Sequence, residues 1–330
     1  VLDRKSQTVV IAGVARMPDL IVLDPDHTLL CRMKPKLSLK LLQRLAKEAP
    51  THPRRMDALK VLSTKSTPKA VASLIEALQS DPFWGVRKRV AGLLASVGTE
   101  TARNALIAAV SAEANPRARR AIVDALGRFS GDELAYQAVF AIADSGDPSW
   151  FAEAAALESV GKLGLDGAAA LLESRLDVVS FNDVIAASAI SGLASLRTAG
   201  ALATIGERTS ARYTTHVRVA AVLAIGRLGA SVPNLRPEVA RVLESLLSET
   251  ELRIRISLVH ALRHGRLAEG RTLLGRIIAR SDGRVHRLAR EASLALAAGV
   301  DAEASAALRG DLEILRAEQG RLRTRLGLLE

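Results

Sequence analysis

The pattern of apolar and polar residues along this chain recurs roughly every 32 residues. In residues 81–94 a turn is followed by basic residues and then by apolar residues at steps of three and four, and residues 115–127 and 216–226 follow the same pattern. This spacing predicts a helix with one buried face. A further amphipathic helix, such as residues 70–78, is predicted between copies. A two-helix unit that recurs at a short fixed period predicts a solenoid.

One position near the start of the second helix is basic in most copies and sets the register of the repeat. Aligned as a column, these positions are Arg55, Arg87, Arg119, Ala152, Ala186, Arg218, Arg255 and His286. By subtraction, successive members are 32, 32, 33, 34, 32, 37 and 31 residues apart. The fourth and fifth copies lack the arginine but keep the small residues that follow it. The column predicts about eight helical hairpins in residues 36–300.

The repeat resembles the short repeats of HEAT-like proteins. The shared pattern is an Asp in the turn, followed by Val-Arg-x-x-Ala-x-x-x-Leu-Gly. Tetratricopeptide and ankyrin arrays have a similar period, but their own sequence patterns are absent here. The resemblance implies an all-α fold, an α-α superhelix of the HEAT-like or armadillo type. We expect a ladder of polar contacts to stack its repeats, formed by Asp81, Arg87, Arg119, Arg218 and Arg255.

Both ends of the chain depart from the repeat. Residues 1–35 hold two β-branched runs, 7–14 and 20–23, which predict a strand pair. Two strands alone are marginal in water, and the chain begins with Val, so we expect this pair to be the remnant of a preceding β-sandwich domain. Residues 301–330 carry a leucine stripe and predict a helix that caps the last hairpin; a free coiled-coil seam is the alternative.

Composition indicates which residues fill the core and in which compartment the fold is expected. Apolar residues make up 48% of the chain and aromatic residues only 3%, so Leu, Ala, Val and Ile are expected to fill the core. A single cysteine excludes an intrachain disulfide framework and fits a reducing, cytoplasmic compartment. Because no run of 18 apolar residues exists, no membrane partner is expected.

The net charge of +11 makes nucleic acid a partner to consider. Residues 1–60 hold 12 basic and 6 acidic residues, residues 61–250 hold 19 and 19, and residues 251–330 hold 15 and 10. Because the excess lies at the ends, a solvated basic surface is favoured over a phosphate track. Trp84 and Trp150 precede second helices, where we expect them to pack between hairpins rather than stack on bases.

Several segments, in this order, resemble the C-terminal part of the gluzincin zinc aminopeptidases of the aminopeptidase N type. They are Asp24-Pro25-Asp26 directly before the first repeat, the turn at residues 81–87, and the closing Leu/Arg/Glu helix. The resemblance covers nearly the whole chain. It implies a helical-repeat domain whose concave face meets the catalytic domain of the parent protein, or its peptide substrate.

The catalytic motif of that family is missing from this chain. The family motif is His-Glu-x-x-His with a further Glu, and the nearest segment here runs from His260 to His264. Ala261 stands at the general-base position and cannot accept a proton, and no third zinc ligand follows at the family spacing. We therefore expect no catalytic residue, no metal and no cofactor in this chain.

The register of the column also predicts which residues of the second helices face the groove. Positions one and five residues after the column are mostly charged in the outer repeats and apolar in the fourth to seventh, and an exposed apolar strip usually marks an interface. The predicted surface consists of Leu157, Val219, Leu223, Ile256 and His260. A register shifted by one residue would instead place them in the core.

Two functions follow from these observations. The first is a non-catalytic interaction domain of a zinc aminopeptidase that shapes peptide access to the catalytic domain. The second is a free-standing HEAT-like scaffold that binds a protein partner or nucleic-acid backbone. A salt titration separates protein from nucleic-acid binding, because phosphate contacts make affinity fall steeply with salt.

Overall fold

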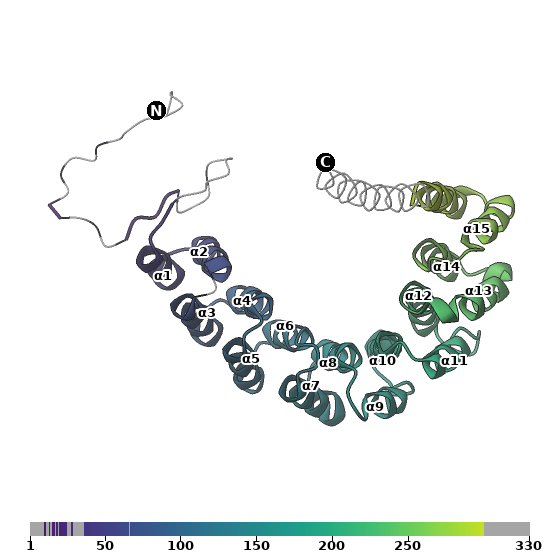
Figure 1. The fold of residues 1–330 in the computed structure, drawn as a ribbon, viewed down its shortest axis with the longest axis horizontal. Helices are drawn as coiled ribbons and strands as arrows, with labels where there is room; N and C mark the ends of the chain where they lie inside the picture. Colours follow the sequence, from purple (N-terminus) through teal and green to yellow (C-terminus); the bar gives the residue numbers. More distant parts are fainter. Residues whose placement is uncertain are drawn as a thin grey trace, which may run out of the picture. The chain divides into compact units, whose positions relative to one another are not determined.

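The structure is a computed structural model that describes residues 36–65 and 67–299, together with residues 10, 13, 15, 16, 18, 20–24 and 28. All regular elements in these parts are helical (Figure 1). The chain forms two compact units, Val1–Ser159 (unit 1) and Val160–Glu330 (unit 2). None of the described helices has the length and apolar character that crossing a bilayer requires.

Unit 1 is built from helices that pair in sequence order. They are α1 (Leu39–Glu48), α2 (His52–Lys65), α3 (Pro68–Ser80), α4 (Trp84–Val97), α5 (Glu100–Ala112), α6 (Pro116–Leu126), α7 (Glu133–Ser145) and α8 (Trp150–Leu163), whose last four residues belong to unit 2. Within unit 1 the odd-numbered helices form one layer and the even-numbered helices a second (Figure 1).

Unit 2 continues the same alternation with short 3₁₀ turns between some helices. Its elements are α9 (Ala168–Ser174), η1 (Phe181–Asp183), α10 (Val184–Leu196), α11 (Ala199–Glu207), α12 (Thr215–Ser231), η2 (Pro233–Leu235), α13 (Arg236–Ser245), η3 (Leu246–Ser248), α14 (Leu252–His264) and α15 (Gly270–Ala279). Residues 283–299 form one more helix.

Paired in order, these helices make eight hairpins, and the predicted solenoid of about eight hairpins is confirmed. Every member of the arginine column lies on the second helix of its hairpin, from Arg55 on α2 to His286 in residues 283–299. The period of about 32 residues therefore located the repeats, because each repeat of the array is one helical hairpin.

Local sequence explains where the first helices begin. Thr67, Thr99 and Thr198 each accept a hydrogen bond from the backbone N–H three residues later, which satisfies a donor that the helix itself leaves open. Asp132 caps α7 in the same way. At the other end, Gly98 closes α4 in the left-handed conformation, with φ of 68°.

The N-terminal strand prediction is wrong for residues 20–23, which are described and lie in no strand. Asp24 bends the backbone at φ of 43°, and its carbonyl accepts a hydrogen bond from Nε of Arg54 on α2 at 3.0 Å. This segment is thus anchored to a helix, whereas a strand needs a neighbouring strand to pair with. Most of residues 7–14 and all of the predicted capping helix, 301–330, lie outside the described residues.

Small residues allow second helices to approach closely. In unit 2, a Cβ built on Gly161 of α8 would lie 2.3 to 2.5 Å from backbone atoms of Gly192 on α10. A Cβ on Gly226 of α12 would lie 2.7 Å from the Cα of Ala261 on α14. Such distances are shorter than any side chain tolerates, so glycine sets the spacing of these helices.

Gly161→Ala should therefore destabilise the protein by about 2 kcal/mol or more, because the added methyl group forces α8 and α10 apart. The midpoint of urea unfolding measures this. Gly275→Ala on α15 is the matched control, since a Cβ there meets nothing within 4 Å. The control should stabilise by up to about 1 kcal/mol through helix propensity. Equal midpoints for the two variants would contradict the close approach.

Candidate interaction surface

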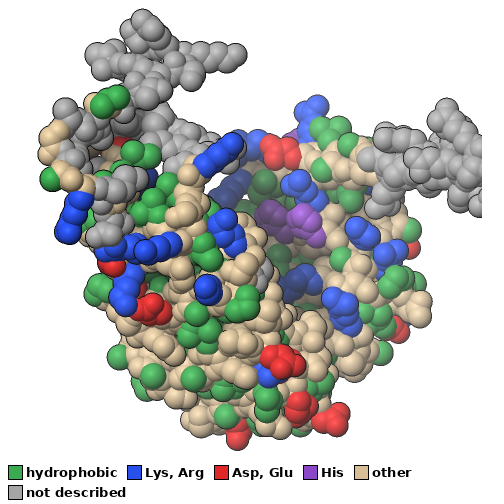
Figure 2. Space-filling model, turned by 60° about the vertical axis from the view of Figure 1, so that its left-hand side comes forward, with side chains coloured by type: hydrophobic (Ala, Val, Ile, Leu, Met, Phe, Trp, Pro, Cys, Tyr) green, Lys and Arg blue, Asp and Glu red, His purple; other side chains and the backbone are tan. Residues whose placement is uncertain are grey.

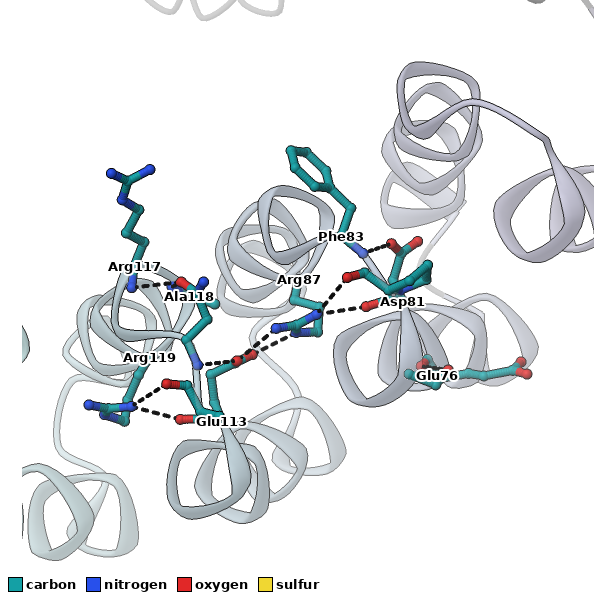
Figure 3. Close-up of polar contacts among 12 residues, drawn as sticks. Glu76, Asp81, Phe83, Arg87, Glu113, Arg117, Ala118 and Arg119 are labelled. Atoms are coloured by element: carbon teal, nitrogen blue, oxygen red, sulfur yellow. Dashed lines mark hydrogen bonds and ion pairs between the residues drawn. The ribbon is translucent and has the colours of Figure 1, made fainter.

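Arg87 on α4 connects two successive hairpins (Figure 3). Its Nε and Nη2 donate to the carboxylate of Glu113 at 2.7 and 2.8 Å, and its Nη1 donates to the carbonyl of Asp81 at 2.8 Å. Asp81 ends the first helix of the same hairpin, and Glu113 ends the first helix of the next one. One guanidinium therefore holds two hairpins together, in the planar fork geometry that carboxylates match.

The same arrangement recurs on both sides of Arg87. Arg55 donates to the carboxylate of Asp81 at 2.7 and 3.0 Å, and Arg119 donates to that of Asp147 at 2.7 and 2.8 Å. Each also donates to the backbone carbonyl six residues before it, at 3.2 Å for Arg55 and 2.8 Å for Arg119. We call these repeated contacts the arginine ladder and each arginine with its acceptors a rung.

The acids of the ladder have a second role in their own hairpins. Each accepts the backbone N–H two residues later, at 2.9 Å for Asp81 and 2.8 Å for Glu113 and Asp147. This contact shapes the turn into the second helix. A rung thus fixes both the junction between hairpins and the turn that starts the next arginine-bearing helix.

Burial and hydrogen bonding shift the pKa values of these carboxyl groups in opposite directions. The hydrogen bonds from Arg87 hold the pKa of Glu113 below its ordinary value of 4.5, although burial opposes the shift. Burial alone would raise the pKa of Asp147, but the hydrogen bonds from Arg119 and from the backbone N–H of Ser149 outweigh burial and lower that pKa. Both groups are therefore ionised at neutral pH.

Unit 2 carries two further arginines of the column. Arg218 on α12 donates to the carbonyl of Thr209 at 2.9 Å and to the carboxylates of Glu249 and Glu251. Arg255 on α14 donates to a neutral group instead, the hydroxyl of Ser281. This rung is the one in which serine occupies the place of the acid.

The two copies with alanine at the column position are held differently. Ala152 and Ala186 are buried, and small residues bring the second helices together beside them. The Ser159 hydroxyl of α8 donates to the carbonyl of Val123 on α6 at 3.1 Å, within unit 1. In unit 2, Arg208 at the end of α11 pairs with Asp177, which lies between α9 and α10.

Sequence reasoning missed most acids of the ladder, because the residue type alternates between Asp and Glu. By subtraction, each acid lies 26, 28 or 31 residues after the arginine that it binds. A spacing within each hairpin could have identified three of these acids. Asp81, Glu113 and Glu249 each lie six residues before a column arginine of their own hairpin.

The structure leaves four of the five residues of the predicted apolar surface at least partly exposed and buries the fifth. Val219 and Leu223 lie on α12, and Ile256 and His260 lie at the same register positions of the adjacent α14. Leu223 is 37% exposed, and the other three are partly exposed. These four residues therefore occupy an open face of unit 2.

The prediction for Leu157 is wrong, because its side chain is fully buried on α8. Every residue from Ala152 to Leu157 is buried, so this helix has no open face at that level. When neighbouring elements cover a helix on all sides, none of its positions at that level faces the groove, and the register of the neighbouring helices does not transfer to it.

Aromatic and arginine side chains gather at the starts of the second helices of unit 1. They form two contact groups, His52–Phe83–Trp84–Arg117 and Arg120–Phe151. The ring centroids of His52 and Phe83 lie 4.5 Å apart, and those of Phe83 and Trp84 lie 5.6 Å apart. The guanidinium of Arg117 lies 5.2 Å from the Trp84 ring, and that of Arg120 lies 5.8 Å from the Phe151 ring. We call these residues the aromatic–arginine band: His52, Phe83, Trp84, Arg117, Arg120 and Phe151.

The band is largely open to solvent. Phe151 is 48% exposed, and its neighbour Trp150 is 43% exposed. The expectation that Trp150 packs between hairpins is therefore wrong, because this residue stands at the first position of α8 with much of its side chain exposed. Sequence patterns could not reveal the band, since three of its four contacts join residues from different repeats.

The wider surface is mixed in character. Figure 2 shows Lys and Arg side chains, coloured blue, spread over the face in view with apolar side chains in green between them. Among the described residues, no group of three or more His, Cys, Asp or Glu side chains could hold a metal ion. His260 and His264 lie one turn apart on α14.

Comparison with known protein families matches residues 71–157 to HEAT repeats. The solved complex of CpcE and CpcF of phycocyanin lyase from a Nostoc species contains a similar chain, with 19% identity and a TM-score of 0.44, over 68% of this chain and 94% of that one. Human deoxyhypusine hydroxylase, solved with glycerol, is similar at 18% identity and a TM-score of 0.35, over 77% and 93%. A search of curated proteins finds no match. The family match confirms the predicted HEAT-like repeats over residues 71–157.

Stability should fall at acidic pH through the ladder acids. The pKa of Glu113 is lower in the folded protein than its ordinary value of 4.5, so the unfolded chain binds the proton more readily. The stability contributed by Glu113 is present above about pH 4.5 and is lost as pH falls through the lowered pKa. Urea midpoints measured from pH 7 to pH 3 should follow this course.

Glu113→Gln should lower the free energy of unfolding by about 2 kcal/mol at pH 7. The further fall in stability between pH 7 and pH 3 should be smaller than in wild type, because the titrating partner of Arg87 is gone. Glu100→Gln, which changes an exposed carboxyl on the same helix, is the control and should keep the wild-type pH profile. An unchanged profile for Glu113→Gln would show that this rung does not control acid stability.

Proposed function

We propose that this chain is a non-catalytic HEAT-repeat scaffold that binds a protein partner through the aromatic–arginine band. The observation that supports this most is that the members of the band come from the starts of four consecutive second helices, α2, α4, α6 and α8. Aromatic rings and arginine are the residues most enriched among those that dominate binding energy at protein interfaces. Exposed apolar surface that is contiguous also favours an interface over chance exposure.

The charge of the same region favours protein over nucleic acid. Residues 36–159 hold 17 basic and 13 acidic residues, which is close to balance. Arg55, Arg87 and Arg119 are committed to carboxylates of the ladder. A phosphate track needs several cations that are not already neutralised, and this requirement is poorly met here.

A narrower proposal concerns the parent protein. By its sequence resemblance, the chain would be the C-terminal domain of a zinc aminopeptidase, and Val219, Leu223 and Ile256 would meet the catalytic domain or its peptide. This part of the proposal rests on the resemblance alone. Ala261, in place of a catalytic Glu, supports a binding role rather than catalysis for the chain itself.

The test is an unbiased peptide-display selection on the immobilised full chain, followed by affinity measurements on the selected peptides. Trp84→Ala and Phe151→Ala should each weaken binding by about tenfold or more, as truncation of a central aromatic anchor does. Leu134→Ala is the matched control, because it removes an apolar side chain of similar exposure, 51%, from α7 in the other helix layer. Its affinity should equal that of wild type.

The rival partner is tested in parallel. Fluorescent single-stranded and double-stranded DNA are titrated at two salt concentrations with the same variants. Tight DNA binding that falls steeply with salt would overturn the proposal in favour of a phosphate-binding scaffold. Selected peptides that bind Phe151→Ala and Trp84→Ala as well as wild type would also overturn it.

A further inference from the structure

Unit 2 contains a pocket of about 300 Å³ beside the incomplete rung. Part of its wall is apolar and is formed by Leu246, Leu258 and Ile277. Arg255, Arg280 and Ser281 line the polar part. The volume is at the lower end for small-molecule sites and suits one or two side-chain-sized groups.

Arg255 is the feature that distinguishes this pocket from the other junctions. Ser281 lies 26 residues after Arg255, the same separation as Asp81 from Arg55 and Glu113 from Arg87. In those two rungs the guanidinium binds both oxygens of a carboxylate. Among the described residues, the guanidinium of Arg255 has only the Ser281 hydroxyl as a hydrogen-bond partner. Its charge is therefore not compensated by a ladder acid.

Glu249, the acid that lines the pocket, already binds another arginine. Glu249 accepts a hydrogen bond from Arg218 and backbone N–H groups of Thr250 and Glu251 at 2.9 and 3.1 Å. Its carboxylate thus belongs to the preceding rung. The other charged residues that line the pocket are Arg255 and Arg280, so its surroundings favour an anion.

We propose that this pocket binds a carboxylate carried by an apolar group, and that the bound carboxylate completes the rung of Arg255. The carboxylate takes the place that Asp81 and Glu113 have at their rungs, and the apolar group lies against the leucine and isoleucine wall. A polypeptide C-terminus with an apolar last residue and a free apolar acid both carry this chemistry. The site is separate from the aromatic–arginine band and does not depend on its role.

Isothermal titration calorimetry on the full chain tests the proposal with two matched probes, N-acetyl-leucine and N-acetyl-leucinamide. The acid should bind, and the amide should bind about tenfold more weakly or not at all, because it lacks the charge that pairs with Arg255. The third probe, 4-methylpentanoate, identifies the source. If 4-methylpentanoate binds with the same affinity as N-acetyl-leucine, the source is a free apolar acid. If it binds clearly more weakly, the source is a polypeptide C-terminus.

Ser281→Asp supplies the missing acid from the chain itself. This variant should bind N-acetyl-leucine about tenfold more weakly and unfold at higher temperature, because the rung is now complete. Ser281→Asn, similar in size and uncharged, should bind as wild type, and Arg255→Gln should lose binding. Equal affinity for acid and amide, no binding of either, or unimpaired binding by Ser281→Asp would each overturn the proposal.

Discussion

The guanidinium–carboxylate pair between successive hairpins is the interaction on which the rest of this structure depends. In a solenoid each repeat contacts only its neighbours, so stability comes from many similar junctions in series. At Arg87 one side chain binds the acid of the next hairpin and the end of the preceding helix in its own. The Glu113 side chain is only 5% exposed, so the pair is costly to break, since loss of one partner leaves a nearly buried charge uncompensated.

Where the arginine is absent, close backbone approach takes over. Ala152 and Ala186 leave no polar rung, and Gly161 and Gly192 let their helices meet almost backbone to backbone. Van der Waals contacts and apolar burial between α8 and α10 then stabilise the junction, and the steric fit of the two helices fixes its geometry. The array thus uses two kinds of junction, one polar and directional, the other apolar and steric. The Arg255 junction is of the first kind but lacks its acid, and this makes it available to an external carboxylate.

The sequence predicted the repeats well because their period and helical spacing are local properties of the chain. It placed all eight column positions on second helices, and it placed Leu223 on an open face. It failed for Leu157, because burial on every side of α8 depends on tertiary packing. It failed for residues 20–23, because β-branched runs form strands only beside a partner strand. It missed the aromatic–arginine band, since Trp84 and Arg117 meet only when two hairpins stack.

A double-mutant cycle across Arg119 and Asp147 tests the central claim most directly, because it isolates the coupling between two hairpins. Urea unfolding is measured for wild type, Arg119→Met, Asp147→Asn and the double variant. If the ladder holds the junctions, the coupling free energy should be about 2 kcal/mol, and each single variant should lose nearly as much stability as the double variant. Additive losses, with a coupling free energy below about 0.5 kcal/mol, would contradict the ladder as the basis of stacking.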